Sequence, residues 1–156
     1  MPHPLVIKRW LYKADQDFGF ASTSLENGYE YYDQPCFFFQ QAAEKYLKAY
    51  TLHHNLRFEK THDLLKLLEI CKENDIDFEE LKGAASELNT LYIEPRYADA
   101  GFKLYTKEET LSAQVAARKI QQFVRKKLGV EREITTEEMK ATEEEADKQF
   151  QQFEGK

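Results

Sequence analysis

Residues 91–99, LYIEPRYAD, hold the side chains best suited to binding a phosphate. Arg96 offers five donors in a planar fork that matches phosphate geometry, and Tyr92 and Tyr97 could stack on a base. Together with Asp99 they are candidate nucleotide-binding residues. A structural alternative stands beside this one: Arg96 pairs with Asp99 and fixes the loop, while the tyrosines fill a core or an interface.

Lys45 and Lys48 form a second candidate nucleotide-binding pair. They lie about one turn apart on a predicted helix, so both could extend a surface that faces phosphate. The alternative is a solvated helix face, which is the usual place for such lysines.

Other chemistries have little support in the chain. It contains no glycine-rich phosphate loop, serine nucleophile constellation or paired-cysteine zinc site, and no second ligand accompanies Asp99 at metal-binding spacing. His53 and His54 suit the negative end of a helix, and Cys36 and Cys71 lie in apolar helical stretches that predict buried thiols. We therefore predict no metal site and no cofactor.

Charge and hydropathy limit the classes of partner. The formal charge is −6, and residues 131–156 carry nine acids and four bases, which leaves residues 1–130 with nineteen acids and eighteen bases. A nearly neutral domain argues against binding duplex DNA but is compatible with a local pocket for a nucleotide or a single RNA strand. Without an apolar run of about 18 residues or a signal pattern, we expect a cytoplasmic protein that does not enter a membrane.

Apolar residues recur at helical spacing, which predicts an all-α fold: an antiparallel up-and-down bundle of four to five helices with a charged C-terminal tail or an extra helix. Gly28 and Gly129 follow apolar-periodic runs and predict helix ends, Thr61 is the expected N-cap of the third helix, and Leu111 and Val115 are expected to face inward. The five predicted helices cover roughly residues 5–27, 33–54, 61–74, 78–93 and 107–128.

The predicted domain covers residues 1–130, and residues 131–156 form an acidic tail, partly helical or disordered. A sixth helix could start at Thr136, whose following glutamates suit a helix N-terminus. Because charge and glutamine dominate the segment, a frayed helix or a disordered tail is favoured over core. The apolar residues that could form a narrow stripe are Met139, Ala146, Phe150 and Phe153.

Four segments together resemble the HEPN domains, small helical proteins named for nucleotide binding in higher eukaryotes and prokaryotes. The resemblance covers about residues 5–127 and depends on the order of the segments through the bundle. The segments are RWLYKADQDFGFA with its Trp10, Ala14 and Asp17, then CFFFQQAAEKYLKAYTLHHN, KTHDLLKLLEIC and LYIEPRYAD.

The resemblance implies a helical bundle that usually dimerises, with a groove lined by the residues after the second and fourth helices. Family members often accompany a small nucleotidyltransferase, and some are metal-independent ribonucleases that use an arginine followed four to six residues later by a histidine. In this chain no histidine follows Arg96. Arg57 and His62 match the spacing but precede the third helix, so they are weak catalytic candidates whose match we interpret as accidental, with His62 orienting a loop.

Three functions follow as hypotheses. The first is a homodimeric binding module that associates with a small nucleotidyltransferase and binds a nucleotide or single-stranded RNA near Arg96. The second is a ribonuclease acting as the toxin of a two-gene pair, although arginine alone cannot serve as a general base. The third is a purely structural oligomerisation module, because nine tyrosines and eleven phenylalanines are more than one small core readily buries.

Overall fold

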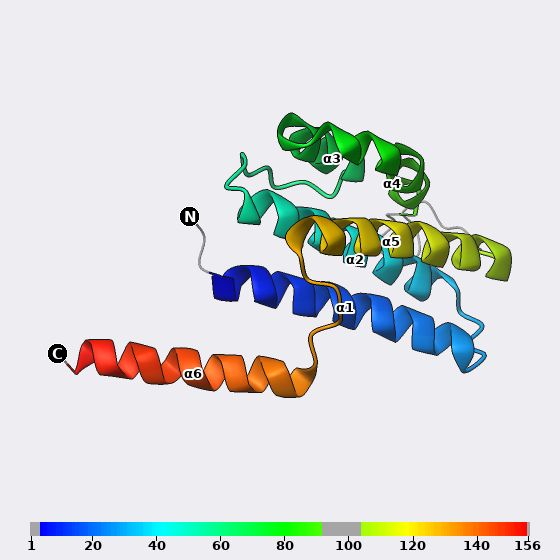
Figure 1. Ribbon diagram of the computed structural model, residues 1–156. Helices are drawn as coiled ribbons and strands as arrows, with labels where there is room; N and C mark the ends of the chain where they lie inside the picture. The colour runs from blue at the N-terminus through cyan, green and yellow to red at the C-terminus, as the bar shows by residue number, and fades with distance from the viewer. Residues whose placement is uncertain (1–3, 92–103, 156) are drawn as a thin grey trace.

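The computed structural model describes residues 4–91 and 104–155, and in these residues it contains helices and no strand (Figure 1). The predicted all-α fold is confirmed. The elements are α1 (Pro4–Glu26), α2 (Asp33–His53), α3 (Leu64–Asn74), the 3₁₀ helix η1 (Ile76–Leu81), α4 (Lys82–Asn89), α5 (Lys107–Leu128) and α6 (Thr136–Glu154).

Helix α2 is the centre of the bundle and packs against α1, α3, α4 and α5. Its small residues Ala42, Ala43 and Ala49 are fully buried, which lets neighbouring helices approach closely. Its large residues Phe39 and Tyr46 are fully buried as well. A helix with several apolar faces must be covered on several sides, and this need makes α2 central.

The helix directions differ from a strict up-and-down order because α3 runs parallel to α2. Cys36 on α2 contacts Thr110 near the start of α5, and Tyr46 contacts Gln121 further along it, so α2 and α5 run the same way. Helix α3 also starts beside the middle of α2 and ends beside its end. The reason is the connection of residues 54–63, which is long enough to return along α2 before α3 begins.

Two helix ends follow local chemistry as predicted, and one does not. Gly129 caps α5 in the left-handed conformation at φ 71°, and Gly28 after α1 has φ 76°. The N-cap of α3 is Asp63 rather than Thr61, because the Asp63 carboxylate accepts from the N–H groups of Leu65 and Lys66. Thr61 instead accepts the N–H of Asp63 at 3.0 Å.

Some side chains face differently from the prediction. Leu111 and Val115 are 42% and 70% exposed on the outer face of α5, because the inward positions are taken by Ala113, Ala116 and Ala117. The prediction of two buried cysteines is confirmed, because Cys36 and Cys71 are both fully buried, and burial raises the pKa of Cys71 to about 12.

A buried polar network joins α1, α2, α5 and the segment before α6. The Asp15 carboxylate accepts from the Tyr46 hydroxyl at 2.5 Å, from the Arg125 guanidinium and from the Ile134 N–H at 3.2 Å. Burial, followed by the charge of Asp15, raises the pKa of Tyr46, so its hydroxyl remains a donor. One carboxylate therefore fixes four segments relative to one another.

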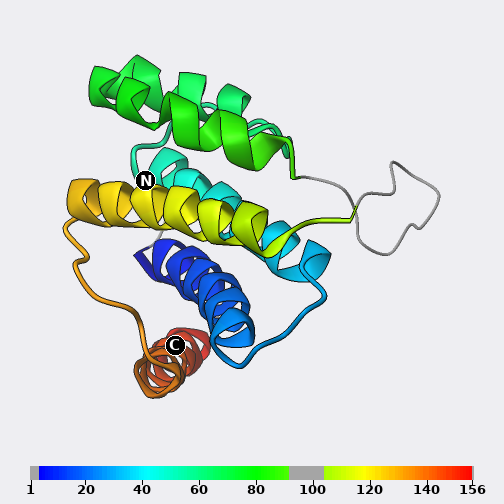
Figure 2. The same cartoon turned by 90° about the vertical axis from the view of Figure 1, so that its right-hand side faces the viewer.

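Helix α6 lies along α1 on the side away from α2 and α5 (Figures 1 and 2). Tyr12 contacts Thr136 at 2.9 Å, Arg9 holds Glu143 through two bonds of 2.5 and 2.6 Å, and Met139 is buried. The structure thus has the extra helix rather than a disordered tail. Its last turns extend past the start of α1 (Figure 1). Of the predicted stripe, Ala146 is half-buried, while Phe150 and Phe153 are 62% and 80% exposed.

None of the helices in the described residues has the length and apolar character that a membrane span requires.

Replacing Asp15 tests whether this carboxylate organises the bundle. Asp15→Asn leaves the buried Arg125 without its anion, and removing one partner of a buried pair costs about 3–5 kcal/mol. We expect urea denaturation to show a loss of that size in the free energy of unfolding. The control is Asp147→Asn on the exposed face of α6, expected to change it by less than about 0.5 kcal/mol. A loss for Asp15→Asn no larger than that of the control would contradict the assignment.

Candidate functional site

A cluster of polar side chains lies where the middle of α2, the start of α3 and the end of α4 meet. We call it the polar cluster and define it as Gln40, Glu44, Lys48, His62 and Asp63. The three α2 residues recur every four positions, which places them on one face of the helix. That face is directed toward the residues that precede α3, so local helix geometry positions three of the five residues of the cluster.

His62 and Glu44 form the core of the polar cluster. His62 Nδ1 lies 2.7 Å from Glu44 Oε1, and Lys48 Nζ lies 3.5 Å from the other carboxylate oxygen. The Glu44 side chain is 5% exposed, whereas that of His62 is 56% exposed. A buried carboxylate therefore orients an imidazole that solvent can reach, which is the arrangement of a positioned proton donor or acceptor.

The backbone around His62 is fixed as well. Gln40 is fully buried and its side-chain N–H donates to the His62 carbonyl at 3.1 Å. Asn89 at the end of α4 donates to the Asp63 carboxylate at 2.8 Å and accepts the N–H of Leu64 at 2.8 Å. These bonds hold the last turn of α4 beside the start of α3.

Asp63 is charged in this setting. The hydrogen bond from Asn89, then those from the N–H groups of Leu65 and Lys66, lower the pKa of Asp63 below its usual range. Its negative charge lies at the positive end of α3, where it is favourable. The N-terminus of α3 is therefore already satisfied by the protein's own carboxylate.

The two candidate lysines are engaged in pairs within the protein. Lys45 contacts Asp17 of α1 at 2.5 Å, and Lys48 pairs with Glu44 and lies 5.8 Å from the ring centre of Trp10. Their side chains are 23% and 13% exposed, so they are not the solvated face that was the alternative. Two lysines balance two carboxylates, and these lysines contribute no net positive charge for a phosphate.

Arg57 and His62 lie apart. Arg57 pairs with Glu73 at 3.0 Å, near the C-terminal end of α3, whereas His62 precedes its N-terminal end. Eleven helical residues separate the two ends by about 16 Å. The structure therefore does not bring this arginine to this histidine.

The candidates Tyr92, Arg96, Tyr97 and Asp99 lie outside the described residues. Near the start of their segment, between α4 and α5, a pocket of about 310 Å³ is lined by Glu87, Glu108 and Glu109 among others. The carboxylates of this pocket would repel a phosphate.

Sequence reasoning did not find Glu44, Gln40 or Asn89. A signal for the first two was present in the four-residue spacing of Gln40, Glu44 and Lys48, but nothing local showed what that face would contact. Among the described residues, no group of three or more potential ligands from His, Cys, Asp and Glu is placed to hold a metal ion.

Comparison with known proteins supports the resemblance predicted from the sequence. A family model described as HEPN domain matches residues 7–127. The crystal structure of TT1696 from Thermus thermophilus is 35% identical, with a TM-score of 0.66, over 78% of this chain and 97% of that one. The structure of ST0689, described as an archaeal HEPN homologue, is 22% identical with a TM-score of 0.60, over 78% of this chain and 96% of that one, and shows the fold alone. No curated protein matches the chain.

Removing the Asp63 carboxylate tests the anchoring of α3 and α4. Asp63→Ala should lower the free energy of unfolding by about 1 kcal/mol at pH 7, the usual loss for an N-cap. Because the pKa of Asp63 is lowered by folding, its contribution is present above the pKa of the unfolded state, near 4, and is lost as the pH falls through the folded value. The difference between wild type and variant should therefore shrink below about pH 4 in denaturation curves.

Thr61→Ala is the matched control, because Thr61 bonds only to the N–H of Asp63 in this turn and does not cap α3. It should cost less than Asp63→Ala. The reverse order, or a difference between wild type and Asp63→Ala that does not change with pH, would contradict the assignment.

Proposed function

This chain belongs to the HEPN domain family, and on that premise we propose that it is a binding module for a nucleotide or single-stranded RNA and the partner of a small nucleotidyltransferase. The observation that carries the proposal is the position of His62. Its exposed imidazole is held by Glu44, and the next residue, Asp63, bonds to Asn89 at the end of α4, the helix that precedes Arg96 in the chain.

The charges in and beside the polar cluster explain why Arg96 is the central residue of the proposal. Lys45 and Lys48 are balanced by Asp17 and Glu44, and Asp63 adds a negative charge, so a bound phosphate needs another cation. Arg96 supplies one by its residue type, in a form that binds phosphate oxygens through two donors. His62 adds a ring that can donate a hydrogen bond or lie against a base.

A metal-independent ribonuclease is the second candidate function, and the contact between His62 and Glu44 is the observation that favours it. A carboxylate 2.7 Å from one ring nitrogen sets the tautomer of an imidazole, as a general base requires. In this candidate the histidine comes from the start of α3, and Arg57, which lies at the other end of that helix, has no part. An enzyme of this kind could act as a toxin, with the nucleotidyltransferase as its regulating partner.

Calorimetry tests the binding module. We expect ATP, GTP or a short single-stranded RNA to bind the full chain, and we expect Arg96→Ala to weaken that binding about tenfold or more, because one charge-assisted phosphate contact is lost. Arg118→Ala on the exposed face of α5 is the matched control and should bind as the wild type does.

The same samples separate the two candidates. RNA incubated with the protein in EDTA should stay intact if the protein only binds. Cleavage that His62→Ala abolishes would make it an enzyme, with His62 as the proton-transfer residue. Absence of binding by every ligand, together with intact RNA, would overturn both candidates.

Self-association is also part of the proposal, and an aromatic surface supports it. Phe20 is 56% exposed, and its ring lies edge-on to that of Phe38 with 5.2 Å between the ring centroids. The ring centroids of Phe38 and Phe37 are 5.8 Å apart. Exposed aromatic residues in contact with one another are typical of protein interfaces. We propose that this surface, at the junction of α1 and α2, joins two copies of the chain.

Sedimentation velocity tests the dimer. The wild type should sediment as a dimer at tens of micromolar, and Phe20→Asp should shift it to a monomer because a charge is placed in an apolar contact. Phe58→Asp is the matched control, since Phe58 is 71% exposed and lies in the connection between α2 and α3. A wild type that is strictly monomeric, or equal effects of the two substitutions, would contradict the proposal.

A further inference from the structure

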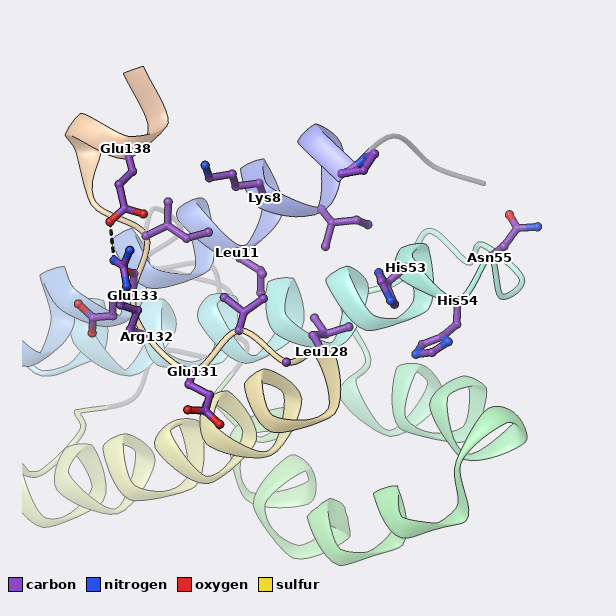
Figure 3. A pocket seen from close by; sticks show the side chains of 15 residues that line it. Lys8, Leu11, His53, His54, Asn55, Leu128, Glu131, Arg132, Glu133 and Glu138 are labelled. Carbon is purple, nitrogen blue, oxygen red and sulfur yellow. Dashed lines mark hydrogen bonds and ion pairs between the residues drawn. The ribbon is translucent and has the colours of Figure 1, made fainter. Parts of the chain in front are cut away.

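A second pocket shares no lining residue with the polar cluster and is formed in part by residues beyond the family match. It opens between the start of α1, the end of α2 and the chain from the end of α5 to the start of α6 (Figure 3). Its volume is about 740 Å³, within the range of about 300–1,000 Å³ that small-molecule sites occupy. The family match ends at residue 127, so residues 128–138 add a wall that the matched region lacks.

The floor of this pocket is apolar. Ile7 and Leu11 of α1 line it from one side, and Leu128, Val130 and Ile134 line it from the chain that follows α5. Ile7, Leu11 and Ile134 are less than a tenth exposed as residues, so the floor is continuous with the core. Such a surface favours the apolar part of a ligand.

The wall formed by residues 128–134 is fixed in place. Gly129 turns the chain in the left-handed conformation, and the Val130 N–H bonds to the Arg125 carbonyl at 3.0 Å. At the other end, the Ile134 N–H donates to the buried Asp15 carboxylate at 3.2 Å. A segment tied at both ends keeps the pocket open without help from a ligand, which reduces the cost of binding.

The charged groups around the pocket sum to a negative value. Three glutamates line it, Glu131, Glu133 and Glu138, against two cations, Lys8 and Arg132. Both cations are engaged: Arg132 pairs with Glu138, as Figure 3 shows, and Lys8 donates to the Thr142 hydroxyl. Glu131 and Glu133 have no ion-pair partner among the described residues.

The helix ends and the histidines add no positive charge to the pocket. The C-terminal ends of α2 and α5 and the N-terminal ends of α1 and α6 all border it, so the partial charges of the helix ends balance one another. His53 and His54 lie on its α2 side (Figure 3). Burial, followed by the neighbouring His53, lowers the pKa of His54, so this ring adds no positive charge at neutral pH.

We propose that this pocket binds a small molecule with an apolar body and a cationic head, such as a primary alkylammonium. The apolar body lies on the floor of Ile7, Leu11 and Leu128, and the head lies at the edge of the pocket that Glu131 and Glu133 line. This function is separate from nucleotide binding, and either proposal can fail without the other.

Octylammonium is the probe, with octanoate and octanol as comparators of equal chain length. Calorimetry on the full chain should show octylammonium binding more tightly than octanol, and octanol more tightly than octanoate. Val130→Phe fills the pocket and should weaken octylammonium binding about tenfold, whereas Val115→Phe on the exposed face of α5 should leave it unchanged.

A second pair of variants tests the head group without changing the shape of the pocket. Glu131→Gln with Glu133→Gln should reduce octylammonium affinity to that of octanol. Glu26→Gln with Glu30→Gln makes the same charge change at the far end of α1 and should have no effect. Octanoate that binds as tightly as octylammonium would overturn the cationic head, and failure of all three probes to bind the wild type would overturn the site.

Discussion

The Asp15 carboxylate makes the contacts that align α1, α2, α5 and the segment before α6. It accepts from Tyr46 on α2, from Arg125 on α5 and from the Ile134 N–H before α6, while its own backbone belongs to α1. A charge this well buried is unfavourable unless its partners are in place, so the four segments must meet with this geometry or leave a buried anion unpaired. Hydrophobic burial makes the bundle compact, and this carboxylate specifies how its parts are aligned.

The contacts of α2 with α1 and α5 also determine which residues lie on its other face. Because Tyr46 is directed to Asp15, the helix face that carries Gln40, Glu44 and Lys48 is directed to the residues before α3, where Glu44 contacts His62. Gln40 and Asn89 then fix the backbone on either side of that histidine. The exposed imidazole is thus positioned by a chain of contacts that starts in the core, although His62 itself lies at the surface.

Electrostatic balance distinguishes the two proposed sites. Around His62, the lysines of α2 are neutralised by carboxylates, so the proposed phosphate site needs a cation from another part of the chain. Around the pocket beside α6, the glutamates that line it exceed the lysine and arginine side chains. The first region lies within the residues that match the HEPN family, whereas the second needs the chain beyond residue 127. The two proposed sites therefore differ in the charge of the ligand that each would bind.

Local sequence was enough to predict the helices, the glycine at the end of α5, the two buried thiols and the family, because each depends on spacing or backbone conformation within a short stretch. It was not enough to predict that Asp63 rather than Thr61 caps α3, since Asn89 from another helix helps to hold that carboxylate. Nor did it show that Val115 faces outward or that Lys45 and Lys48 are paired, because apolar periodicity leaves the facing of a helix open. The contact of Glu44 with His62 joins residues from separate elements, and only the packing of α2 against the chain before α3 could bring them together.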